Sequence, residues 1–133
     1  MGTHSLIIMR EKIENKYLVY AVLYQQYDGY LKGVGLQLMR FLKDIKIVNG
    51  FDPRSKEKLA NGAGCLFAQI VSHFKKEVGG TYLMNPSQYD SEEYDYYVDV
   101  DGSNISIRIE CHNEFEGSIT EAINFINQSE NDE

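Results

Sequence analysis

Polar side chains that could hold a ligand are concentrated in residues 25–35 (QQYDGYLKGVG), between a predicted strand and a predicted helix. Backbone amides at the start of a helix, together with the positive end of its dipole, can bind an anion. We therefore take Gln26, Asp28 and Tyr30 as candidate ligand-binding residues. The glycine spacing matches neither the Walker A motif nor G-x-G-x-x-G. A plain turn that ends the preceding strand explains the same residues.

A second stretch is acidic and could bind a basic partner. Residues 1–84 contain twelve Lys and Arg against seven Asp and Glu, a net charge of +5. Residues 85–133 contain one basic residue, Arg108, against thirteen acids, a net of −12, and together the two parts give the chain's −7. An acidic surface repels nucleic acid and attracts basic protein surfaces. The candidate residues of this acidic face are Asp95, Tyr97, Asp99, Asp101 and Glu110.

No motif points to a reaction or a metal. Residues 99–110 (DVDGSNISIRIE) carry acids at the first, third and twelfth positions of a calcium loop, but Asn104 replaces the glycine required at the sixth. His112 near Glu110 and Glu114 could gather a cation, although a solvated cluster at a sheet edge is the simpler interpretation. The histidines show no spacing such as H-E-x-x-H. We therefore expect no catalytic residue, no metal and no cofactor.

The two cysteines do not suggest a site either. Cys65 falls in an apolar helical stretch and Cys111 on the apolar face of a predicted strand, far apart in the sequence. Free cysteines in such positions behave as small hydrophobic residues. We predict two reduced thiols in the core.

The clearest predicted element is a buried helix in residues 61–80 (NGAGCLFAQIVSHFKKEVGG). Its apolar side chains recur at the helical period: Phe67, Ile70, Val71, Phe74 and Val78. Gly62 and Gly64 weaken the first turn, which suggests a packing or ligand role there. Asn61, at this start, therefore joins Gln26, Asp28 and Tyr30 as an alternative ligand site. The sequence does not determine whether residues 25–35 and the helix start at Asn61 are adjacent in space.

The remaining patterns predict strands and two more helices. Residues 5–10 and 16–25 form a hairpin, residues 81–84 a short strand, and residues 94–100 and 105–111 alternate apolar and polar side chains. Asp101-Gly102 joins the last two strands, with two possible registers. A helix follows the glycine-rich loop, and a capping box at Ser118–Glu121 opens the last one. The order ββααβββα predicts an α+β fold, with one antiparallel sheet of about five strands and helices on one face.

We expect residues 1–128 to form a single domain and residues 129–133 a flexible acidic tail. No apolar run approaches the ~18 residues that span a membrane. The N-terminal MGTHSLIIMREK lacks a signal-peptide cleavage site. We therefore expect a cytoplasmic protein that contacts no membrane.

Several segments between Gly2 and Leu83 together resemble a family of small proteins from bacteria and their phages, whose pattern reads GTRSL, then Q-F/W-DGYP, then NG-M-GCLAAQL. The segments are GTHSL (2–6), QQYDGY (25–30), IVNG (47–50), NGAGCLFAQIVSHFK (61–75) and GGTYL (79–83). His4 and Leu31 depart from the arginine and proline of that pattern. The resemblance implies no known reaction. It implies a phage or mobile-element setting within a bacterial host.

These observations favour a non-enzymatic binding or inhibitor protein, phage-encoded, that acts on a host defence or nucleic-acid-handling complex through its acidic C-terminal half. The partner would present a basic surface, and direct contact with nucleic acid is not expected. The alternative is a protein that binds, and could hydrolyse, a nucleotide or other small anion at residues 25–35 and Asn61. A homo-oligomer in which basic and acidic halves pair is a third possibility.

Overall fold

Six strands form one mixed sheet whose strand order is β5-β2-β1-β6-β7-β8. The computed structural model describes residues 2–129. The strands of this sheet are β1 (Ser5–Ile13), β2 (Lys16–Gln25), β5 (Thr81–Met84), β6 (Tyr94–Asp101), β7 (Asn104–Glu110) and β8 (Phe115–Gly117). Two further strands, β3 (Lys46–Val48) and β4 (Leu59–Asn61), pair in parallel at one end of the molecule.

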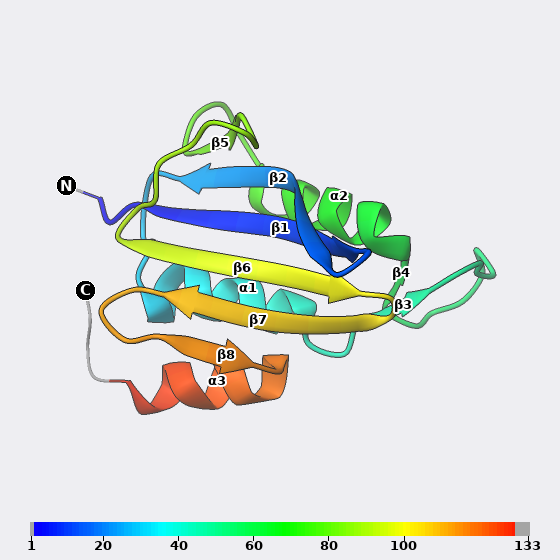
Figure 1. The fold of residues 1–133 in the computed structure, drawn as a ribbon. Helices are drawn as coiled ribbons and strands as arrows, with labels where there is room; N and C mark the ends of the chain where they lie inside the picture. Colours follow the sequence, from blue (N-terminus) through cyan, green and yellow to red (C-terminus); the bar gives the residue numbers. More distant parts are fainter. Residues whose placement is uncertain (1, 130–133) are drawn as a thin grey trace.

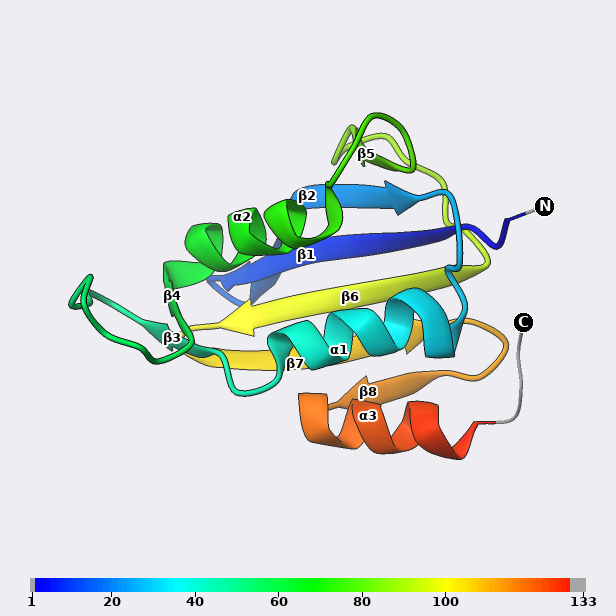
Figure 2. The same ribbon diagram turned by 180° about the vertical axis from the view of Figure 1, so that it is seen from behind.

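The helices gather on one face of the sheet, and no helix of the described residues lies on the other (Figures 1 and 2). They are α1 (Leu36–Leu42), α2 (Gly62–Phe74) and α3 (Ile119–Gln128). A kinked turn at Leu31–Gly35, in which Gly33 has non-helical dihedral angles, precedes α1. All three contribute to a single buried cluster with one face of β1, β2, β6 and β7. This arrangement confirms the predicted α+β fold with helices on one face. No helix among residues 2–129 is long and apolar enough to cross a membrane.

The sheet differs from the prediction in being mixed rather than wholly antiparallel. The central pair, β1 and β6, is parallel, with Ser5 beside Tyr94 and Arg10 beside Asp99. An alternating strand shows the same apolar pattern whether its neighbour is parallel or antiparallel, so the sequence could not distinguish them. The sheet also has one strand more than expected, β8, whose three residues are too few to show a period.

Alternation in β6 separates its two faces as predicted. Tyr94, Tyr96, Val98 and Val100 are buried under the helices. The next strand joins it through a two-residue turn, in which Asp101 pairs with Asn104 and Gly102 has a φ of +64°. This register, left open by the sequence, places Glu110 directly opposite Asp95.

Helix α2 is shorter than predicted but buries most of the predicted stripe. Phe67, Ile70 and Phe74 are buried and Val71 is partly buried, whereas the helix ends at Phe74 and Val78 beyond it is 99% exposed. Ala63 and Leu66 are buried as well. Cys65 is exposed, which corrects the prediction of a core thiol.

Cys111 is half-buried, and its thiol donates a hydrogen bond to the backbone oxygen of Asn113 at 3.0 Å, so neither cysteine lies fully in the core. At the C-terminus, Ser129 caps α3. Of the predicted acidic tail, residues 130–133 lie outside the described residues.

Candidate functional site

The uncovered face of the sheet carries the residues of the predicted acidic face. Asp95, Tyr97, Asp99 and Asp101 alternate with the buried residues of β6, and Glu110 lies beside them on β7. The strands β1 and β7 flank β6 on either side. The structure therefore brings these five residues together on one surface, which we call the open face.

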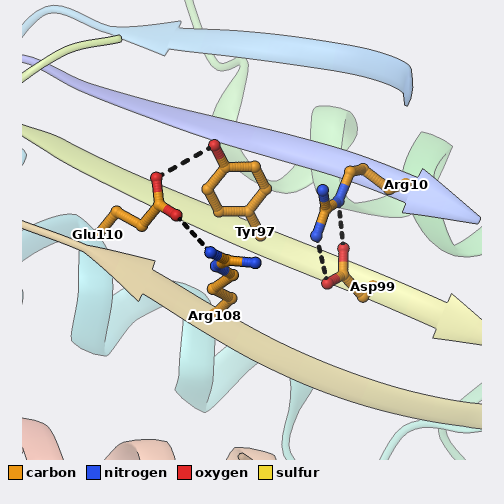
Figure 3. Close-up of polar contacts among 5 residues, drawn as sticks. All are labelled: Arg10, Tyr97, Asp99, Arg108 and Glu110. Atoms are coloured by element: carbon orange, nitrogen blue, oxygen red, sulfur yellow. Dashed lines mark hydrogen bonds and ion pairs between the residues drawn. The ribbon is translucent and has the colours of Figure 1, made fainter. Parts of the chain in front are cut away.

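Arg10 of β1 neutralises the most central of these acids. Its Nε and Nη2 each donate to one carboxylate oxygen of Asp99 at 2.7 Å (Figure 3). The pair is largely buried, with 6% of the Asp99 side chain and 18% of the Arg10 side chain exposed. The hydrogen bonds to Asp99 raise the pKa of Arg10, despite the opposing effect of burial. A two-pronged contact of this kind is among the stronger ion pairs in proteins.

Tyr97 lies between two arginines on the open face. Its ring centroid is 4.5 Å from the guanidinium carbon of Arg10 and 5.9 Å from that of Arg108 (Figure 3). Arg108 in turn pairs with Glu110 at 3.0 Å, and the Tyr97 hydroxyl donates to the other oxygen of Glu110 at 3.4 Å. Burial and nearby carboxylates raise the pKa of Tyr97 to about 12, so its hydroxyl remains a donor at physiological pH.

Asp95 is the most unusual carboxyl group of the open face. Only 3% of the residue is exposed, and one of its oxygens accepts a hydrogen bond from the backbone N–H of Glu92 at 3.0 Å. Burial raises the pKa of Asp95 to about 6, and the nearby Glu110 and Glu92 add to the shift. Its charge therefore changes near neutral pH. Within residues 2–129 its hydrogen bond is to the backbone N–H of Glu92 and not to a nucleophile or a base, so we assign it no catalytic role.

Basic side chains therefore balance part of the negative charge of the open face. Asp101 is exposed, and one of its oxygens lies 3.9 Å from Lys12. Glu116 of β8, opposite Arg108, is exposed on the same face. The carboxylates that a partner could reach are therefore Asp101, Glu116 and part of Glu110.

A hollow of about 610 Å³ lies at the other candidate site. Gln26 and Asp28 line it from the loop of residues 25–35, and Lys76 lines it from the segment that follows α2. At its base the hydroxyl of Thr81 donates to the side-chain oxygen of the buried Gln25. The hollow offers an amide, a carboxylate and an ammonium group to a polar ligand.

The glycines of this loop are explained by contacts within the protein. A Cβ on Gly33 would lie 2.2 Å from the backbone oxygen of Asp28. A Cβ on Gly35 would lie 2.9 Å from the Tyr96 hydroxyl, which itself donates to the backbone oxygen of Gly29 at 2.7 Å. These close approaches account for the glycines without a bound anion.

Asn61 does not belong to this hollow. Its side-chain oxygen accepts a hydrogen bond from the backbone N–H of Gly50 at 2.8 Å, at the β3–β4 end of α2. Gln26 bonds to Gly80, beyond the opposite end of that helix. Thirteen helical residues, roughly 20 Å at 1.5 Å each, separate the two ends. The glycine-rich helix starts are therefore not adjacent, and Tyr30 packs against the core rather than lining the hollow.

The histidines and acids form no metal site within residues 2–129. His112 is exposed and has its ring edge against Tyr94, while Glu110 is occupied by Arg108 on the open face. His73 is partly covered because its ring stacks on that of Phe41, with the two ring centroids 4.4 Å apart.

Sequence reasoning missed the basic members of both sites. Arg10 follows Leu6 and Ile8 on one face of β1, and a charged group in such a row indicates a buried partner. That signal was present, but the partner could not be named before the parallel pairing of β1 with β6 was known. Lys76 and Thr81 lie outside the glycine-rich loop, so its motif gave no sign of them.

A comparison of this chain with protein-family models, with curated proteins and with solved structures found no match.

Proposed function

We propose that this is a non-enzymatic binding protein that docks on a basic surface of a partner protein through its open face. The observation that carries the proposal is that the helices cover one face of the sheet only, while the other holds five carboxylates against three cations. The carboxylates are Asp95, Asp99, Asp101, Glu110 and Glu116, and the cations are Arg10, Lys12 and Arg108.

Aromatic side chains add contact area to this face. Tyr17 is 39% exposed and Tyr97 is half-buried, and both lie against the guanidinium of Arg10. Tyrosine and arginine are enriched in the residues that dominate protein interfaces. The network is held rigidly by its ion pairs, so little side-chain entropy is lost when a partner binds.

The class of partner follows from the charge. The carboxylates that a partner can reach, Asp101, Glu116 and part of Glu110, carry the same sign of charge as nucleic-acid phosphates, so a basic cleft that binds nucleic acid could accept them. A host defence or nucleic-acid-handling complex is the partner we propose, and the phage setting implied by the sequence resemblance supports that choice.

The test is a pull-down from host lysate across a range of salt concentrations, with Asp101→Lys/Glu116→Lys as the disabled variant. Both positions are exposed, so the variant should fold. We expect a partner that is retained at low salt, released as salt rises, and lost with the double variant. Glu57→Lys, an exposed reversal on the loop between β3 and β4, should bind like the wild type.

Reversal of Asp95 or Asp99 is unsuitable for this purpose because both are buried and the variants would unfold. A complex that resists salt, or that survives the Asp101/Glu116 reversal, would contradict the proposal.

A second candidate function is the binding of a small anion, such as a nucleotide, in the hollow beside residues 25–35. Its support is the convergence of Gln26, Lys76 and the buried Gln25–Thr81 pair on one 610 Å³ space. A thermal-shift screen with nucleotides should raise the melting temperature of the wild type but not of Lys76→Glu. Lys56→Glu, on an exposed loop away from the hollow, serves as the matched control. No shift with any nucleotide would remove this candidate.

A further inference from the structure

Exposed apolar side chains gather along one edge of the sheet. Among residues 2–129, ten large hydrophobic side chains are exposed, and seven of them lie on β2, on β5 or at the adjoining end of β1. The seven are Ile13, Tyr17, Leu18, Tyr20, Tyr82, Leu83 and Met84. Contiguous exposed apolar surface on a folded protein commonly marks an interaction site.

The backbone of this edge is also unpaired over part of its length. Strand β5 pairs only with Val22–Gln25, and β1 occupies the inner side of β2. Within the described chain no strand pairs with the outer side of residues 16–21. Such an edge presents free N–H and C=O groups that can accept another strand.

We propose that two copies of this chain associate through residues 16–20 of β2, in antiparallel pairing about a two-fold axis. The two sheets of six strands would join into one sheet of twelve. A closed two-fold interface of this kind is the commonest form of homo-oligomer.

The directions of the side chains fix the register of this pairing. On the open face, Tyr17 lies against the guanidinium of Arg10, and Val19 packs against the buried cluster of Leu6, Ile8 and Val22. On the helix face, Tyr20 contacts Phe67 of α2. Residues directly opposite each other in a sheet point to the same side. With the two-fold axis normal to the sheet at Leu18, Leu18 meets its own copy and Tyr17 meets Val19.

The same register makes the charges complementary. Lys16 at one end of the pairing falls opposite Tyr20 of the other copy. The Tyr20 hydroxyl donates to Glu11, so a carboxylate lies at the position that the lysine reaches. The two-fold axis repeats this Lys16–Glu11 contact at both ends. This self-complementarity favours a second copy over a strand from another protein, which would have to supply the same charge order.

Features at the ends of this segment limit the pairing to residues 16–20. A bulge between Met9 and Arg10 leaves Tyr20 as the extra residue of β2, and beyond it β5 occupies the edge. At the other end the chain turns at Glu14 and Asn15, both with positive φ. One second copy therefore occupies the free part of β2, and no third copy can pair with that edge.

The test is sedimentation of the full chain over a wide range of concentrations, at low and at high salt. The wild type should form a dimer that persists at high salt, because its contacts are apolar and backbone-mediated. Leu18→Lys places two ammonium groups at the axis and should raise the dimer dissociation constant about a hundredfold or more. Val78→Lys, at a fully exposed position off the edge, should dimerise like the wild type.

Hydrogen exchange on the wild type gives a second readout that does not depend on how Leu18→Lys folds. The amides within residues 16–20 that point away from β1 should be protected at high protein concentration and exposed at low concentration. A monomer at every concentration, a dimer unaffected by Leu18→Lys, or a dimer dissociated by salt alone would each overturn the proposal. A monomer whose residues 16–20 become protected only in host lysate would assign the edge to a strand of another protein.

Discussion

Arg10 and Asp99 form an ion pair in the middle of the sheet, and the loss of either side chain would leave the charge of the other largely buried without a partner. Replacing Arg10 by Ala leaves the carboxylate of Asp99 nearly buried without its cation. Removal of one partner from such a pair costs about 3 kcal/mol. We expect Arg10→Ala to lower the free energy of unfolding by about that amount, measured by urea denaturation.

The neighbouring Lys12–Asp101 pair is the control for this prediction. Its two charged atoms are 3.9 Å apart, and 36% of the Lys12 side chain and 60% of the Asp101 side chain are exposed. Exposed pairs contribute at most about 1 kcal/mol. Lys12→Ala should therefore change stability far less than Arg10→Ala, and equal losses would show that Arg10 acts through general charge and not through its contact with Asp99.

The raised pKa of Asp95 gives stability a pH dependence of defined sign. Because the folded-state pKa of about 6 exceeds the ordinary value near 4, the folded protein holds the proton more tightly than the unfolded chain. Ionisation of the buried Asp95 carboxyl group destabilises the folded protein. This destabilisation is absent below about pH 4, grows as the pH rises to about 6, and is complete above that. Asp95→Asn cannot ionise and still accepts the Glu92 N–H. It should stabilise the protein by about 2 kcal/mol more at pH 7.5 than at pH 4, relative to wild type.

Urea unfolding of both proteins at the two pH values measures this difference. Asp90→Asn, at an exposed position, controls for the loss of a charge. A gain for Asp95→Asn that is the same at both pH values would mean that the carboxyl group does not titrate differently in the folded state.

The two glycines in the first turn of helix α2 have different structural roles. Gly62 has a φ of +87°, which a residue with a Cβ adopts only under strain, whereas Gly64 has helical geometry and open space where its Cβ would be. Gly64→Ala should raise the free energy of unfolding by about 0.5–1 kcal/mol, because glycine is a poor helix former. Gly62→Ala should lower it by about 1 kcal/mol.

Thermal unfolding of the two alanine variants distinguishes these cases. If Gly64→Ala destabilises the protein, then the space where its Cβ would lie is occupied by a partner that the monomer does not contain. The same experiment on Gly33→Ala should show a larger loss, since its Cβ would meet the backbone oxygen of Asp28.

Elements with a strong local signal were predictable, and those defined by their neighbours were not. Alternation located β6 and β7, and Ser118 and Glu121 form the capping box expected from the sequence. The parallel pair β3–β4 was not predicted, because a strand of three residues is too short to show a period. Helix α2 was extended to Val78 because the apolar spacing continues past Phe74, although the segment that follows leaves the helix to reach β5.

The candidate site was predictable only in part for the same reason. The acidic residues of β6 follow from alternation, and the structure does bring them together. Their neutralisation by Arg10, Lys12 and Arg108 depends on which strands lie beside β6, and the sequence gives no register for a parallel pair 89 residues apart. The separation of Asp28 from Asn61 likewise depends on how α2 crosses the sheet.

The basic and acidic parts of the chain are not separate units. Strand β1, from the basic part, lies between β2 and the acidic β6 in one sheet. Its Ile7 and Met9 belong to the same buried cluster as Tyr96 and Val98 of β6. Removal of either part would expose a long edge and an apolar face of the other, so neither should fold alone.

We therefore expect one cooperative unfolding unit centred on β1 and β6, which native-state hydrogen exchange can test. Amides of these two strands should exchange at the same slow rate, set by global unfolding, because neither can open without breaking the pairing shared by both halves. The edge strand β8 and the exposed residues 49–58 between β3 and β4 should exchange faster, since few buried contacts hold them. If β6 and β7 exchanged faster than β1 and β2, the acidic part would open independently. The sheet would then contain two units, and the Arg10–Asp99 pair would lie at the boundary between them.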